Sequence, residues 1–346
     1  MRNNCSVMVL LASSRELKLA MGYNLIIAAL GTPLFVWGSL KLWTGMFMRT
    51  FHINLRLIMQ MYLIGLILHC YGRVTLHALD LYNYTVLDPC EMIPNIYRCF
   101  VFRFFYNSGI WITIYTTIPL IIERLIATIL KDRYENRFLW IGVLLMFLPV
   151  CLAAFPLYLA YSNLAFDGVF MPYCSVYKPG HPEIANLNSE IALVSQVVAR
   201  IMFGYLFYHN KKLRAKMQRS SLSMRFQLEQ NKISMQCLKI YADISTIFLF
   251  AQMGSFTYLM KIAPGMPWER YLAWMEMNYQ FPLYGIITVL LVAKRITSVR
   301  NQINTALTSQ FTANAQEVFF VRFNKQIGVK VPRQADPNLI FVKRYF

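Results

Sequence analysis

The amino-acid sequence predicts an all-α membrane protein: a bundle of seven helices with a short N-terminal segment and a longer C-terminal tail. Hydrophobic residues make up 57% of the 346 residues and charged residues only 14%, whereas soluble domains carry about 25% charged residues. The apolar residues fall in long blocks with few charges inside them, and each block can cross the hydrocarbon core of a bilayer. Lysine and arginine gather in alternate connections between these blocks.

Seven blocks are long and apolar enough to be membrane spans. They divide the chain into an N-terminal segment (1–18), a transmembrane bundle (19–293) and a tail (294–346). An apolar run before the first block, Val7–Ala12, is shorter than a usual signal-peptide core, so we expect the first span to act as its own insertion signal. The predicted spans are Leu19–Leu42, Leu55–Leu79, Cys99–Ile129, Phe138–Tyr161, Leu187–Tyr208, Met235–Ile262 and Tyr271–Ala293.

The distribution of basic residues predicts the orientation. With the N-terminus outside, the inner connections and the tail hold 22 lysines and arginines, and the outer segments hold 6. Because basic residues favour the cytoplasmic side, this asymmetry predicts an outer N-terminus and a cytoplasmic C-terminus. The net charge of +18 is therefore an orientation signal with some attraction to anionic lipids, and it does not predict nucleic-acid binding.

The third inner connection and the start of the tail have helical patterns of their own. Leu213, Met217 and Met224 recur at helical spacing, so spans five and six are expected to continue as helices beyond the membrane. In the tail, apolar positions 296, 299, 303 and 307 form one stripe, which predicts a helix lying along the inner leaflet. The last forty residues are expected to be loosely ordered.

Two glycosylation signals agree with this orientation. The N-x-Ser/Thr sequons begin at Asn4 and Asn83, and both lie in segments assigned to the outside. They are predicted glycosylation sites.

The cysteines near the outer face predict a disulfide bond. Cys99 begins span three and Cys174 lies in the second outer connection, which must fold back over the mouth of the bundle. A Cys99–Cys174 bond would hold it there and close a loop of about 75 residues. Cys90 is a competing partner on the same side, and Cys5 could pair with the cysteine left over.

Ionisable side chains within spans are costly, so they are the main candidates for function. Several polar residues fall at similar depth near the outer face and predict a ligand pocket between the helices. The alternative is that Arg73 or Arg103 reaches the interface, or pairs with Glu276 for structural reasons only. The predicted pocket residues are Arg73, His77, Arg103, Tyr106, Asn107 and Glu276.

A second ion pair is predicted between Arg200 in span five and Asp243 in span six. Both lie well inside adjacent helices, above their inner ends. A buried pair there could be a switch that breaks on rearrangement or a purely structural contact.

The sequence contains no enzymatic constellation. Its five histidines show no metal-ligand spacing apart from His69 and His77, two turns apart on span two. There is no P-loop, GxSxG, HExxH or CxxC motif. We therefore predict no catalytic residues, no metal and no cofactor.

Four short motifs between span two and span six are distinctive when taken together. They are Asp88-Pro-Cys90-Glu, Glu123-Arg124-Leu-Ile-Ala-Thr, Met171-Pro-Tyr-Cys174 and Leu222-Ser-Met-Arg-Phe-Gln-Leu-Glu-Gln-Asn231. With them the chain resembles the nematode serpentine chemoreceptors of class alpha/beta, within the larger alpha superfamily, from the run beginning at Phe51 to the end of span seven. The last motif departs from the family pattern at Phe226 and at the added Gln230.

The resemblance implies a G-protein-coupled receptor fold and a set of partners. It implies a heterotrimeric G protein, an external small-molecule ligand and a multi-pass location in the plasma membrane, in the sensory cilia of chemosensory neurons. Glu123-Arg124 then occupies the place of the acid-arginine switch of rhodopsin-like receptors, with Leu125 in place of the tyrosine that usually follows.

Two alternatives to signalling remain open from the sequence. One is a transporter or channel without G-protein coupling, although the seven spans show no repeated halves of the kind common in transporters. The other is a receptor-like scaffold that does not signal.

Overall fold

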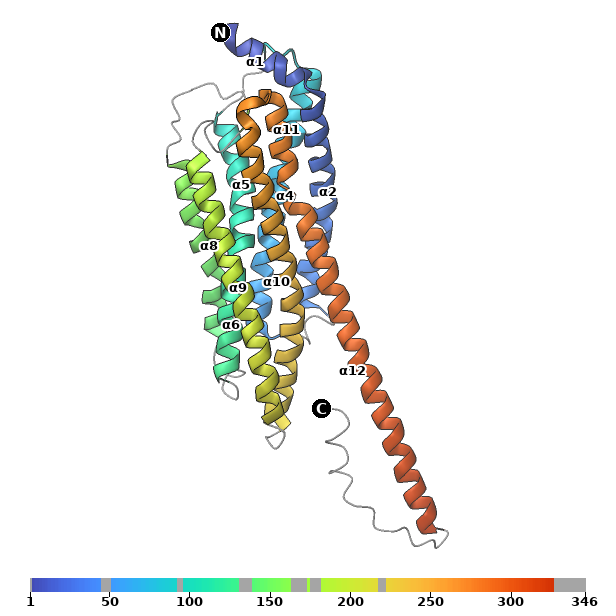
Figure 1. Ribbon diagram of the computed structural model, residues 1–346. Coiled ribbons are helices and arrows are strands. Elements are labelled where there is room, and N and C mark those ends of the chain that lie inside the picture. The colour runs from blue at the N-terminus through green and yellow to red at the C-terminus, as the bar shows by residue number, and fades with distance from the viewer. Residues whose placement is uncertain are drawn as a thin grey trace.

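The computed structural model describes residues 2–44, 51–91, 96–130, 139–162, 173–174, 182–216 and 222–326, and every regular element in these ranges is helical (Figure 1). The helices pack side by side into one bundle. They are α1 (Arg2–Ser13), α2 (Arg15–Trp43), α4 (Ile53–Val86), α5 (Ile96–Tyr115), α6 (Thr117–Leu130), α8 (Leu139–Tyr161), α9 (Pro182–Lys216), α10 (Leu222–Ile262), the 3-10 turn η2 (Ala263–Gly265), α11 (Trp268–Asn278) and α12 (Phe281–Gln326).

Within the described residues, seven helical stretches are long and apolar enough to cross a membrane, which confirms the predicted seven-helix fold. Each predicted span lies within one of them, apart from Phe138, which lies outside the described residues. The stretches are Arg15–Trp43, Ile53–Val86, Ile96–Leu130, Leu139–Tyr161, Asn186–Leu213, Ile233–Gly265 and Trp268–Gln302.

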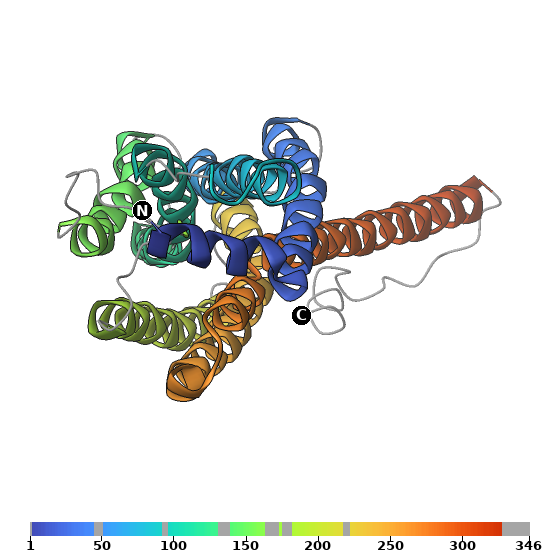
Figure 2. The same cartoon turned by 90° about the horizontal axis from the view of Figure 1, so that it is seen from above.

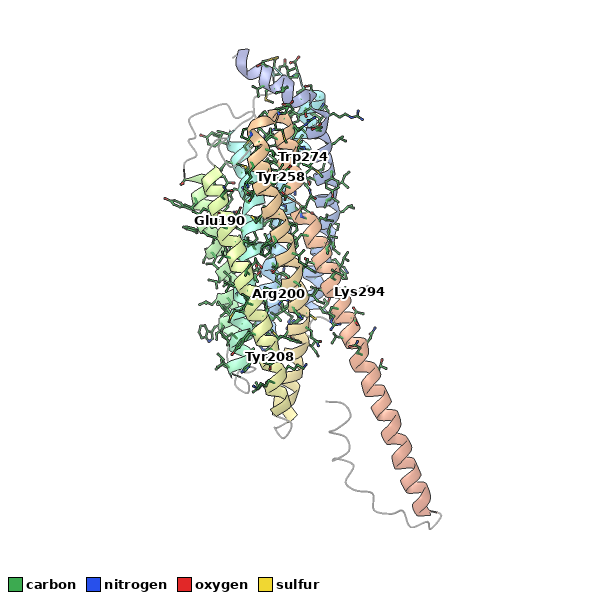
Figure 3. All side chains as sticks on the ribbon, in the orientation of Figure 1. Glu190, Arg200, Tyr208, Tyr258, Trp274 and Lys294 are labelled. Atoms are coloured by element: carbon green, nitrogen blue, oxygen red, sulfur yellow. A yellow bond between two sulfur atoms is a disulfide. The ribbon has the colours of Figure 1, made fainter. Side chains whose placement is uncertain are left out.

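Large apolar side chains cover the outside of the bundle, as lipid contact requires. Tyr208, Tyr258 and Trp274 point outward in Figure 3 and are 66%, 64% and 53% exposed. In a soluble protein such a surface would drive association, whereas hydrocarbon solvates it. We call the end of the bundle that carries both disulfide bonds the disulfide end, and the opposite end the Arg124 end.

Prolines interrupt two of the seven spans. Span three is split at Thr116, between α5 and α6, because Pro119 has no N–H to donate to the carbonyl of Tyr115. Span seven is split at Tyr279–Gln280, two residues before Pro282, and Gln280 N bonds to Asn278 O at 3.0 Å instead of continuing the helix. The second break leaves carbonyl groups of α11 available to other helices.

Glycines allow α4 and α5 to pack closely. A Cβ atom on Gly72 would lie 2.6 Å from the backbone nitrogen of Tyr106 on α5, and one on Gly109 would collide with the backbone of His69 on α4. Such contact between backbones needs residues without a side chain. It brings arginines of the two helices to the same place in the bundle interior.

The N-terminal segment forms a helix that the sequence analysis did not predict. α1 lies across the disulfide end, as the view from above shows (Figure 2). Its Met8 and Leu11 are buried against a cluster that includes Tyr84 and Tyr173. Ser14 ends α1 and caps α2 by accepting a bond from Leu17 N at 3.3 Å.

The C-terminal tail differs from its prediction. α12 continues from span seven to Gln326 as one helix that leaves the bundle, where we expected a separate helix along the inner leaflet and loosely ordered residues from 307 (Figure 1). No glycine or proline occurs between Ile286 and Ile327, so nothing in the sequence ends the helix there. Residues 327–346 lie outside the described part of the chain.

Candidate functional site

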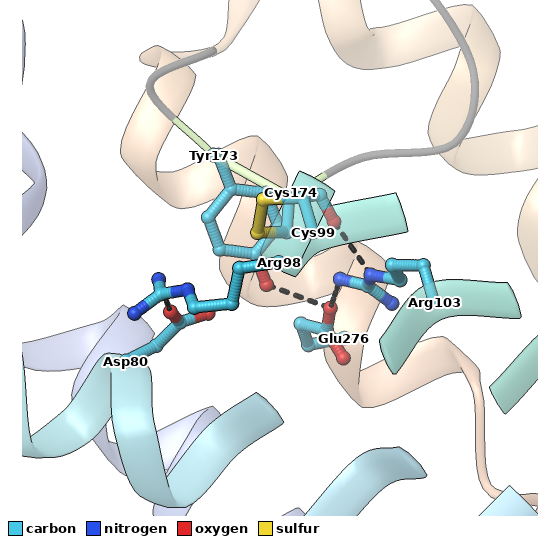
Figure 4. The surroundings of a disulfide bond; sticks show 7 residues. All are labelled: Asp80, Arg98, Cys99, Arg103, Tyr173, Cys174 and Glu276. Carbon is cyan, nitrogen blue, oxygen red and sulfur yellow. Dashed lines mark hydrogen bonds and ion pairs between the residues drawn. A yellow bond between two sulfur atoms is a disulfide. The ribbon is translucent and has the colours of Figure 1, made fainter. Parts of the chain in front are cut away.

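The carboxylate of Glu276, in the last turn of α11, is the centre of a buried polar cluster at the disulfide end (Figure 4). Its Oε1 accepts bonds from Arg103 Nη2 at 2.7 Å and from the Tyr173 hydroxyl at 2.6 Å. Its Oε2 lies 3.4 Å from Arg73 Nη2 and 3.3 Å from His77 Nε2. Two spans and the 173–174 segment therefore meet on this one carboxylate.

Arg73 on α4 fastens span seven at its break. It donates to the carbonyl oxygen of Tyr279, and its Nη2 donates to the carbonyl oxygen of Glu276 at 3.1 Å. Asn24 on α2 donates to the same Glu276 carbonyl at 2.8 Å. The carbonyls freed by the break before Pro282 thus receive partners from two other spans, and Arg73 has 0% of its surface exposed.

Arg103 on α5 fastens the 173–174 segment. Its Nε donates to the carbonyl oxygen of Cys174 at 2.5 Å, while Nη2 holds Glu276. The guanidinium lies 5.0 Å from the centre of the Tyr106 ring, within the range of a cation–π contact. Arg103 is 7% exposed, so it is the least covered of the charged groups in this cluster.

Two disulfide bonds close this end over the cluster. Cys99–Cys174 joins the start of α5 to the 173–174 segment, and Cys5–Cys90 joins α1 to the turn that follows α4. Burial and the neighbouring charge of Glu276 raise the pKa of the Tyr173 phenol well above its ordinary value. The phenol is therefore protonated at neutral pH and serves as a donor to Glu276.

A second buried cluster lies at the Arg124 end. Arg124 on α6 donates through Nε and Nη2 to the two carboxylate oxygens of Glu123, its neighbour in the chain. Its Nη1 donates to Asn231 Oδ1 on α10 at 2.9 Å. Glu123 is 0% and Arg124 2% exposed, so the pair is closed off from solvent.

Amide and hydroxyl groups extend this cluster across three helices. Asn231 Nδ2 donates to Asn210 Oδ1 on α9 at 3.1 Å, and Asn210 Nδ2 donates to the Thr128 hydroxyl on α6 at 3.0 Å. Thr128 in turn donates to the Arg124 carbonyl at 2.8 Å. At the Arg124 end, α6, α9 and α10 are thus joined by one hydrogen-bonded network.

A family model described as serpentine type 7TM GPCR receptor class ab chemoreceptor matches residues 2–328. The chain belongs to this family. Two Caenorhabditis elegans proteins are similar to it. Serpentine receptor class beta-6 is 23% identical over 219 residues, 62% of this chain and 64% of that protein. Serpentine receptor class alpha/beta-14 is 25% identical over 218 residues, 60% of this chain and 54% of that protein.

Membership of a serpentine receptor family bears on the alternatives. This is a family of multi-pass membrane receptors and not of enzymes, and it does not favour the transporter or channel. The matched part of the chain spans less than two thirds of either relative.

Among the residues that the structure describes, no group of His, Cys, Asp and Glu side chains could hold a metal ion.

Five of the six predicted pocket residues of this serpentine receptor lie together. Asn107 does not join them, because it donates to the Tyr161 hydroxyl on α8 at 2.9 Å. The rest form a buried ionic cluster, and that they line a ligand pocket stays a prediction. The five are Arg73, His77, Arg103, Tyr106 and Glu276, each at most 7% exposed.

The predicted ion pair of Arg200 and Asp243 forms between α9 and α10. It differs from the buried pair that the sequence suggested, because the two side chains are 36% and 35% exposed; Arg200 is labelled in Figure 3. The disulfide bonds of the receptor follow the pairing that the sequence favoured, with Cys5 taking the remaining Cys90.

Sequence reasoning missed four residues in or beside the first cluster. Tyr173 was named only as the neighbour of Cys174, and Asn24, within the first predicted span, was not among the candidates. The Asp80–Arg98 pair, with a 2.9 Å contact beside the cluster, was also missed. The sequence did contain a sign of that pair, because Asp80 directly follows predicted span two and Arg98 directly precedes predicted span three.

Proposed function

We propose that this serpentine receptor is a G-protein-coupled chemoreceptor. An external small molecule binds at the disulfide end, and a heterotrimeric G protein binds at the Arg124 end. The observation that carries the proposal is that one span holds a member of both buried clusters. Arg103 and Arg124 are 21 residues apart on α5–α6, about 32 Å along a helix. A movement at one cluster can therefore be transmitted to the other along one span.

The proposed orientation places the disulfide end outside the cell. Both disulfide bonds and both sequons, at Asn4 and Asn83, belong to this end, and disulfides persist in oxidising surroundings. The 22-to-6 asymmetry of basic residues supports the same orientation. A plasma-membrane location, and the sensory cilia suggested by the family resemblance, follow as expectations.

In this mechanism the described conformation is the resting state. The Arg124 network ties α6 to α9 and α10, which keeps the inner ends together. A ligand that favours a rearranged disulfide end would shift the population toward a state in which α10 separates from α6. The space between the inner ends would then admit the G protein.

Nucleotide exchange on G proteins tests the function without a known ligand. Membranes containing the receptor and a panel of heterotrimeric G proteins are assayed for GTP uptake, and Glu123→Gln is compared with wild type. Loss of the carboxylate weakens the hold on Arg124, so basal exchange should rise several-fold. Glu16→Gln is a matched control, because its carboxylate pairs with Arg270 in an exposed position. Exchange equal to that of receptor-free membranes for every G protein, in both variants, would reject the proposal.

A further inference from the structure

The disulfide-end cluster holds more positive than negative charge. Arg73 and Arg103 share the single carboxylate of Glu276, while Asp80 and Arg98 cancel each other. Counted without His77, the described side chains therefore sum to one excess positive charge in a site no more than 7% exposed, apart from Arg98. An uncompensated buried charge is costly, and arginine cannot lose its proton to remove it. One additional negative charge would make the cluster neutral.

We infer that the ligand of this receptor is a small organic molecule with one carboxylate, and that Arg103 is its anchor. The inference rests on the proposed function and names the chemistry of its ligand. A monoanion makes the cluster neutral, whereas a cation would raise the excess to two charges. A carboxylate is the group that Arg103 already holds, and a planar guanidinium can bind its two oxygens.

The two arginines are not equivalent in this role. Arg73 is fully covered and is fixed by the backbone of the span-seven break, where it bonds to the carbonyls of Glu276 and Tyr279. Arg103 makes one bond to Glu276 and one to the carbonyl of Cys174 in the 173–174 segment. A ligand carboxylate can replace Glu276 on Arg103 while Glu276 keeps Arg73 and His77.

This exchange would couple binding to movement. When Arg103 turns to the ligand, the bond between α5 and α11 through Glu276 is lost, while the bond between α4 and α11 remains. The hydrogen bond from the Tyr173 hydroxyl to Glu276 is then broken as well. The 173–174 segment can move away from Glu276, although the Cys99–Cys174 disulfide still ties it to α5. The span that carries Arg103 also carries Arg124, which provides the path to the second cluster.

Thermal unfolding of the purified receptor in lipid nanodiscs tests the inference. Sodium acetate, butyrate, hexanoate and benzoate are compared with their amides at constant ionic strength, since a bound ligand raises the unfolding midpoint. We expect at least one acid, and none of the amides, to raise the midpoint of the wild-type receptor. In Tyr173→Phe, Glu276 is held by one donor fewer, so the acid should bind about tenfold more tightly.

Variants of two arginines on α5 show where the acid binds. Arg103→Gln should abolish the shift, and Arg103→Lys should retain it with affinity weakened about tenfold, because lysine keeps the charge but not the paired donors. Arg98→Lys is the matched control and should respond as wild type, since it keeps the positive charge that cancels Asp80 at a position 26% exposed.

Three outcomes would overturn the inference. They are equal shifts from acids and amides, no acid-specific shift in either wild type or Tyr173→Phe, and a shift that persists in Arg103→Gln. The assay contains no G protein, so its result is independent of nucleotide exchange. A receptor that binds acids but exchanges no nucleotide would reject the proposed function alone, and one that exchanges nucleotide without binding acids would reject only the ligand class.

Discussion

At the disulfide end two arginines from different spans converge on Glu276, whereas at the Arg124 end one arginine is held by the glutamate beside it in the chain. The first cluster has an excess positive charge and bonds to a covalently tethered segment. The second is charge-balanced and is extended by neutral amides of α9 and α10. The difference indicates a site that can accept an anion at one end and a contact that can open without gaining or losing charge at the other.

The largest expected effect is a loss of stability, and it should be greater at the Glu276 cluster than at the Arg124 cluster. Glu276→Gln leaves Arg73 and Arg103 buried without a counter-charge, which should cost about 3–5 kcal/mol. Glu123→Gln leaves one arginine that still bonds to Asn231, so its cost should be smaller. Thermal unfolding in nanodiscs and cell-surface labelling measure both. Equal midpoints for the two variants would contradict the difference in charge balance.

Arg124→Ala should remove signalling but keep the fold. A carboxyl group that loses its partner can bind a proton and become neutral, whereas a buried arginine cannot be neutralised. We expect GTP exchange to fall to the level of receptor-free membranes while surface labelling stays largely intact. If Arg124→Ala still stimulates GTP exchange above the level of receptor-free membranes, Arg124 is not part of the switch.

Asn231→Ala should raise basal activity by a smaller amount. Its Oδ1 accepts directly from Arg124, and a hydrogen bond to a charged group contributes about 1.5 kcal/mol or more, enough for roughly a tenfold change. Asn210→Ala is the comparison, because Asn210 reaches Arg124 only through Thr128 and Asn231. Basal GTP exchange should therefore rank Asn231→Ala above Asn210→Ala, and the reverse order would argue against the direct bond.

The smallest effect is expected at the surface of the disulfide end. Glu16 and Arg270 form a paired contact at 2.9 Å, but both side chains are 51% exposed. Exposed pairs are screened and contribute little. Glu16→Ala should leave the unfolding midpoint and the acid response unchanged. A large fall in the unfolding midpoint or in the acid response of this variant would mean that surface charges at this end matter as much as the Glu276 cluster.

The Glu123–Arg124 pair was easier to predict from the sequence than the Glu276 cluster. Glu123 and Arg124 are adjacent, so the pair could be recognised from the chain alone, and Asn231 ends a motif that the family resemblance had marked. Glu276 and Arg103 are 173 residues apart, and their shared depth could be estimated only from positions in the predicted spans. Asn107 shows the limit of that estimate, because equal depth does not fix the direction in which a side chain points.

By itself the sequence determined the number of spans, their approximate positions and the basic asymmetry, because apolar length and charge are local properties that the bilayer selects directly. The tertiary structure alone decided that Arg73 and Arg103 share one carboxylate and that Tyr173 closes over it. These features depend on helix rotation, on the close approach of α4 and α5 and on the break before Pro282. They depend on which faces of distant helices meet, and hydropathy does not encode that information.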